Sequence, residues 1–161
     1  MYQFFVISCS VFICFWIETL LTDLVGAWFT PNLLIVLIVF FNLLRGIRYS
    51  LLTALLAGLL KDSFGAGTFG FHTVSFIASA YLTSLTKIYI YQTGTNAARV
   101  LLVFFIALAN VTLQCIMNMM FNTIEFARVF VHIIVPEVLV TSALTPYIFK
   151  KFKRCALRLF A

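Results

Sequence analysis

The sequence predicts an all-α polytopic membrane protein, with six transmembrane helices in one integral membrane domain covering residues 1–161. Hydrophobic residues make up 63% of the chain and charged residues only 10%, and the mean hydropathy is +1.11. A spanning helix needs roughly 20 mostly apolar residues to cross about 30 Å of hydrocarbon. The apolar runs are continuous rather than alternating, as residues 33–44 show, which favours helices over the strands of a barrel.

The short polar gaps between the apolar runs define the predicted elements. The first span has no basic segment before it, and its apolar run is too long for a signal peptide, so we expect it to be retained. Arg45 and Gly46 leave so short a connection between the second and third spans that the two must form an antiparallel hairpin. The predicted spans cover residues 3–22, 31–44, 48–64, 69–86, 98–121 and 129–149, followed by a basic cytoplasmic tail, 150–161.

A glycine-rich turn joins the third predicted span to the fourth. Its glycines, from Gly58 to Gly70, permit positive φ angles and close backbone approach. We expect Asp62 to cap the fourth helix or to accept amide protons from the turn, with Lys61 reaching toward the membrane interface beside it. Gly58 and Ala54 form a pair of small residues that lets another helix pack closely against this span.

The fifth predicted span carries a row of amide side chains. Asn110, Gln114, Asn118 and Asn122 are spaced four residues apart, which places them along one helical face. Such a row can line a substrate cavity, but in membranes it more commonly forms hydrogen bonds to a neighbouring helix. We therefore expect interhelical packing, with Glu18 of the first span as a candidate partner.

The last predicted span contains Pro136 and Glu137, and it ends near Pro146, just before the basic tail. A proline inside a helix frees a carbonyl and tends to bend the helix. An unpaired charge in hydrocarbon costs at least about 2.5 kcal/mol, so Glu137 requires an explanation. It either forms a binding or coupling site at the bend, or it is protonated or hydrogen-bonded and fixes helix packing; we favour packing.

The distribution of basic residues predicts that both termini are cytoplasmic. With that orientation, nine of the 11 Lys and Arg residues lie on the inside, and only Lys61 and Arg128 lie outside. The basic tail then serves as a topology anchor near anionic lipid headgroups rather than as a nucleic-acid site. The nine inside residues are Arg45, Arg48, Lys87, Arg99, Lys150, Lys151, Lys153, Arg154 and Arg158.

The sequence offers no set of residues for catalysis. It contains no phosphate-binding glycine loop, no HExxH motif, no Ser/His/Asp set and no Cys/His metal cluster. We therefore expect no enzyme activity, no cofactor and no metal site.

Four ordered features resemble the family of the rod shape-determining protein MreD. The strongest is the glycine-rich turn, although Ala66 stands where the family usually has glycine. The features are the turn residues Gly58, Asp62, Thr68 and Gly70, the pair Pro31 and Asn32, the pair Pro136 and Glu137, and Pro146.

The resemblance implies a noncatalytic scaffold of the cell-elongation machinery in the bacterial inner membrane. Such a scaffold would bind the bitopic protein MreC and, through it, link MreB filaments to peptidoglycan synthesis by RodA and a penicillin-binding transpeptidase. We expect the MreC span to pack against a groove whose outer half is shaped by Pro136, Glu137 and the Gly58 to Gly70 turn. Candidate structural or interface residues also include Pro31, Asn32, Asn110, Gln114, Asn118 and Pro146.

The resemblance also leaves a transport function open. The family's helical bundle is similar to that of the substrate-binding S components of energy-coupling-factor vitamin transporters. An S component should bring polar residues from several helices into one cavity and carry an alanine motif for its partner, and neither is evident in the sequence. A lipid-metabolising membrane enzyme is a third reading, and it lacks catalytic groups.

Overall fold

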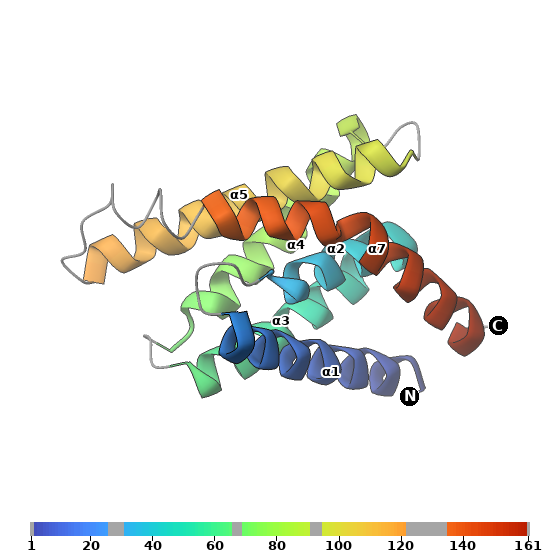
Figure 1. Ribbon diagram of the computed structural model, residues 1–161, viewed down its shortest axis with the longest axis horizontal. Helices are drawn as coiled ribbons and strands as arrows, with labels where there is room; N and C mark the ends of the chain where they lie inside the picture. The colour runs from blue at the N-terminus through green and yellow to red at the C-terminus, as the bar shows by residue number, and fades with distance from the viewer. Residues whose placement is uncertain (1, 26–30, 66–68, 91–94, 122–134, 161) are drawn as a thin grey trace.

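The computed structural model describes residues 2–25, 31–65, 69–90, 95–121 and 135–160, and every element in these ranges is an α-helix (Figure 1). The all-helical fold class is therefore confirmed for the described part of the chain. The helices are α1 (Tyr2–Val25), α2 (Leu33–Arg45), α3 (Ile47–Phe64), α4 (Phe71–Ile90), α5 (Asn96–Phe121) and α7 (Val135–Phe160).

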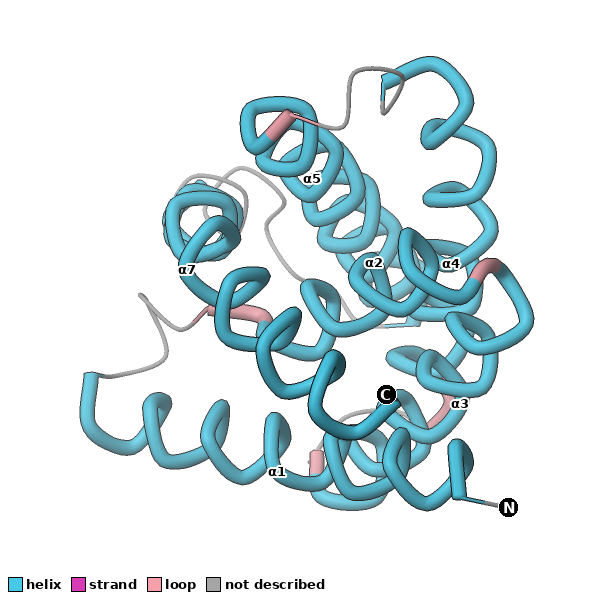
Figure 2. The backbone as a smooth tube through the Cα atoms, turned by 90° about the vertical axis from the view of Figure 1, so that its right-hand side faces the viewer, coloured by secondary structure: helices cyan, strands magenta, loops and turns pink. Residues whose placement is uncertain are grey.

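Helix α2 lies at the centre of the bundle (Figure 2). Each residue from Pro31 to Asn42 is buried, and α2 contacts α1, α3, α4, α5 and α7. The first and last helices bring the two ends of the chain to the same end of the bundle (Figure 1). We call this the terminal end, and the other the opposite end.

The predicted hairpin between the second and third spans is confirmed. Gly46 has a φ of 90°, a conformation that favours glycine. Its amide donates to the Asn42 carbonyl at 3.1 Å, which closes α2. The Ser50 hydroxyl then donates across the hairpin to the Ile38 carbonyl at 3.0 Å.

Close packing at Gly58 is also as predicted. A Cβ atom at Gly58 would lie 2.4 Å from the Thr73 Cα atom, so only glycine permits this approach of α3 to α4. Ala54, one turn earlier on α3, is fully buried. The pair of small residues therefore serves packing between helices of this chain.

Two of the described helices are long and apolar enough to cross a membrane, over Phe4–Leu24 and Ala97–Met120. Helix α2 is apolar but has only 13 residues, or about 20 Å at 1.5 Å per residue. That is shorter than the roughly 30 Å of hydrocarbon. The count of six transmembrane helices stays a prediction.

The last helix differs from the sequence prediction at both ends. It begins at Val135, and residues 129–134 of the predicted span lie outside the described residues. Pro136 falls in the first turn, where a helix needs no amide donor, so the bend predicted at Pro136 is wrong. The helix then continues through Pro146 into the predicted tail and ends at Phe160. Figure 1 shows that the N-terminal half of α7 runs beside α5 and that its C-terminal half turns away from α5.

Replacing Gly58 by alanine should destabilise the protein, because the new Cβ meets backbone that can move only if α3 and α4 separate. Overpacking of this kind costs about 1–3 kcal/mol. Thermal unfolding in mild detergent measures the effect, with Leu59→Ala on the exposed face of α3 as the control. Equal melting temperatures for Gly58→Ala and the unmodified protein would contradict the close packing.

Candidate functional site

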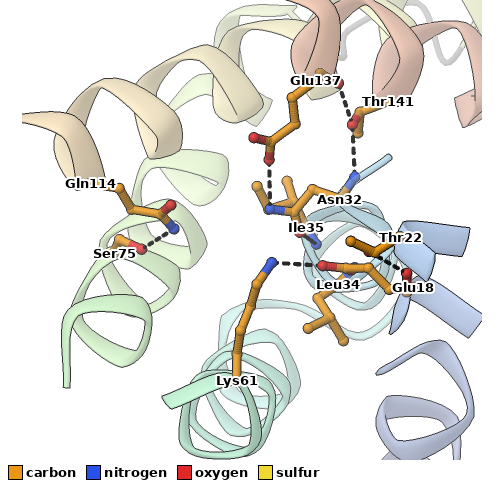
Figure 3. Close-up of polar contacts among 10 residues, drawn as sticks. All are labelled: Glu18, Thr22, Asn32, Leu34, Ile35, Lys61, Ser75, Gln114, Glu137 and Thr141. Carbon is orange, nitrogen blue, oxygen red and sulfur yellow. Dashed lines mark hydrogen bonds and ion pairs between the residues drawn. The ribbon is translucent and has the colours of Figure 1, made fainter. Parts of the chain in front are cut away.

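A group of polar side chains from four helices meets inside the opposite end of the bundle (Figure 3). Glu18 comes from the buried face of α1, which also carries Ile7, Val11 and Cys14 at helical spacing. Lys61 comes from the last turn of α3. We call the group the polar cluster, and it consists of Glu18, Asn32, Lys61, Glu137 and Thr141.

An ion pair joins α1 to α3 within the polar cluster. The Lys61 Nζ atom lies 2.6 Å from the Glu18 Oε1 atom, and the two side chains are 25% and 11% exposed. The other carboxylate oxygen of Glu18 accepts the Leu34 amide at 3.4 Å, in the first turn of α2. Lys61 therefore points inward and not toward the interface, and Glu18 bonds to Lys61 and the Leu34 amide rather than to the described amides of α5. Neither expectation holds for the described residues.

Asn32 connects α2 to α7. Its Oδ1 atom accepts the Ile35 amide at 3.3 Å, as an N-cap does. Its Nδ2 group donates to the Glu137 Oε1 atom at 3.0 Å, and its backbone amide donates to the Thr141 hydroxyl at 2.9 Å. That hydroxyl donates in turn to the Glu137 carbonyl at 2.7 Å.

The structure thus brings together two sequence pairs that were singled out separately. Pro31 and Asn32 lie 105 residues before Pro136 and Glu137, measured between Asn32 and Glu137. No sequence signal predicted this contact, because neither pair indicates which distant helix it faces. Glu137 accepts a hydrogen bond that fixes packing, as favoured above.

Asp62 caps α4, as predicted. Its Oδ1 atom accepts the His72 amide at 3.0 Å, and its Oδ2 atom accepts the Thr73 amide at 3.0 Å and the Thr73 hydroxyl at 2.6 Å. Gly70 supplies the turn with a φ of 99°. Thr68 and Ala66 of the same motif lie outside the described residues.

The amide row of α5 faces α4 rather than α1. The Asn110 Oδ1 atom accepts the Ser79 hydroxyl at 3.2 Å, and the Gln114 Nε2 group donates to the Ser75 hydroxyl at 3.0 Å. Asn118 is partly buried and makes no side-chain hydrogen bond to another described residue. Asn122 lies outside the described residues.

A groove between α4 and α5 is a second candidate site. Its volume is about 350 Å³. The sequence prediction placed a groove at the opposite end, beside Pro136 and Glu137, whereas this one runs along the middle of α5. The small residues Ala109 and Thr112 of α5 are a sequence feature that could have indicated it. It is lined by Leu82, Thr86, Phe105, Ile106, Leu108, Ala109 and Thr112.

The chain matches the model of a known protein family. The model of the family described as rod shape-determining protein MreD matches residues 1–154. No curated protein and no solved structure matches the chain.

Removing one charge of the Glu18–Lys61 ion pair should lower the free energy of unfolding more than removing both charges. Glu18→Gln or Lys61→Met leaves a largely buried charge without its partner, which costs about 3–5 kcal/mol. The double variant removes both charges, so its loss should be clearly smaller than the sum of the single losses. Unfolding free energies in mild detergent test this, and strictly additive losses would contradict a direct pair.

Glu137→Gln should lower the free energy of unfolding less than Glu137→Leu does. Glutamine keeps an oxygen that can accept from Asn32, whereas leucine leaves that buried donor unpaired at a cost of about 1–3 kcal/mol. The same unfolding measurement compares the two variants. If both lose stability equally, the site requires the charge of Glu137 rather than its hydrogen bond.

Proposed function

The chain belongs to the rod shape-determining protein MreD family, and we propose that it is a noncatalytic, multi-pass scaffold in the bacterial inner membrane. In this role it binds an MreC-like bitopic membrane protein. Through that partner it couples MreB filaments to peptidoglycan synthesis by RodA and a penicillin-binding transpeptidase. Both of its termini lie in the cytoplasm, as the distribution of basic residues favours.

The observation that carries this proposal is that the carboxylates inside the opposite end bond to groups on neighbouring helices. Glu18 pairs with Lys61, Glu137 bonds to Asn32, and Asp62 bonds to the first turn of α4. Bonds of this kind hold helices in fixed positions. They support a rigid platform for another membrane protein better than they support chemistry on a substrate.

The groove between α4 and α5 is the place where we expect the span of the partner to lie. Ala109 and Thr112 are small enough to let a second helix approach the backbone of α5. The hydroxyls of the groove are already bonded within their own helices, Thr112 to the Ala109 carbonyl at 2.9 Å and Thr86 to the Leu82 carbonyl at 2.8 Å. An apolar helix can therefore cover them without leaving a donor unpaired.

Filling the groove should release the partner. Ala109→Leu places a larger side chain in it, and overpacking of about 1–3 kcal/mol corresponds to roughly 5- to 150-fold weaker binding. Tagged purification from mild-detergent membranes, with mass spectrometry of the co-purified proteins, measures recovery of the MreC-like protein. The matched control is Ala143→Leu, at an exposed position of α7.

Asp62→Ala extends the same test to the opposite end. This variant should still insert into the membrane but should lower recovery of the MreC-like protein, because α4 loses its cap and the α4 wall of the groove shifts. Recovery that stays unchanged in both Ala109→Leu and Asp62→Ala would contradict the proposed surface. Co-purification of an ATPase module or a bound vitamin would instead indicate an S component.

A further inference from the structure

Charge is divided between the two ends of the bundle. The acidic side chains that the structure describes all lie toward the opposite end, and the sequence has no Asp or Glu in residues 24–61 or after Glu137. The terminal end carries basic residues of several helices, with no described acidic residue among them. They include Arg45 at the end of α2, Arg48 on α3, Lys87 near the end of α4, and Lys150 and Lys151 on α7.

Contacts between α2 and α7 bring the two lysines of α7 close to the C-terminal half of α2, which ends at Arg45. The ring of Phe40 lies 5.3 Å from that of Phe149 and 5.3 Å from that of Phe152, measured between centroids. Phe149 is buried, whereas its neighbours Lys150 and Lys151 are exposed. The helix that continues past Pro146 is therefore fixed against α2, and it presents both lysines beside the end of the bundle.

Exposed apolar side chains border the basic residues. Tyr147 is 61% exposed and Leu44 is 49% exposed. The Lys151 Nζ atom lies 5.4 Å from the centroid of the Tyr147 ring, so charge and apolar surface adjoin directly. A molecule that satisfies both must combine an anionic group with an apolar part.

We propose that this terminal basic surface, formed by Arg48, Lys150, Lys151, Tyr147 and Leu44, binds anionic phospholipid. The headgroup phosphate contacts the basic side chains, and the acyl chains cover Tyr147 and Leu44. An acidic protein segment arriving from water would match the charges but not the apolar border. Charge counting alone explains the topology of a membrane protein, but it does not require the lysines to be held in place, as they are here.

Purified full-length protein reconstituted into vesicles of equal phosphatidylglycerol and phosphatidylcholine tests the proposal. After extraction in mild detergent, mass spectrometry of the retained lipid should show phosphatidylglycerol enriched about threefold over phosphatidylcholine. Lys150→Gln/Lys151→Gln should bring the ratio close to one, and Lys150→Arg/Lys151→Arg should keep it. Raising the salt from 0.15 to 1 M shortens the screening length from about 8 to about 3 Å and should also lower the ratio.

Equal ratios in the unmodified protein and the glutamine variant would overturn the proposal. So would an equal lipid ratio in the vesicles combined with loss of a cytoplasmic protein when the glutamine variant is purified from native membranes, which would assign the surface to an acidic protein segment. Because the vesicles contain no partner protein, neither result bears on the groove between α4 and α5. The vesicle experiment therefore tests the lipid site independently of the scaffold function.

Discussion

Burial of α2 along nearly its whole length is the constraint on which the other contacts depend. The first amides and last carbonyls of a helix have no partner within it, and a buried helix cannot leave them to water. At the start of α2, the Leu34 amide donates to Glu18 and the Ile35 amide to Asn32. At its end, the Asn42 carbonyl accepts from Gly46 at 3.1 Å and from the Lys87 Nζ atom at 3.3 Å.

The ionisable groups inside the bundle follow from this requirement. A carboxylate that accepts an amide of α2 is itself costly to bury, so it needs a cation close by. Lys61 supplies that cation from α3, with its Nζ atom 2.6 Å from the Glu18 Oε1 atom. The start of one central helix thus explains the polar cluster, and no catalytic role is needed to account for it.

The sequence predicts the contacts that lie close together along the chain, and it fails where distant helices must be aligned. The bonds of Asp62 reach 10 and 11 residues ahead, so turn chemistry alone indicated them. The direction of Lys61 depended on the position of Glu18, 43 residues away, and the Asn32 contact depended on α7. The bend at Pro136 failed for a different reason, because the same proline is favourable in a first turn and disruptive further along.

The polar cluster also bears on the choice between scaffold and transporter. A substrate site must offer donors and acceptors that a ligand can take up and release. Here the Glu18 and Lys61 side chains are joined at 2.6 Å, and Asn32 uses its amide, its side-chain oxygen and its side-chain nitrogen on α2 and α7. A ligand entering the polar cluster would have to break bonds that hold α1, α2, α3 and α7 together. The same bonds would then have to serve both ligand binding and folding. This arrangement therefore favours a permanent structural role for the polar cluster, with partners contacting the outer surfaces of the bundle.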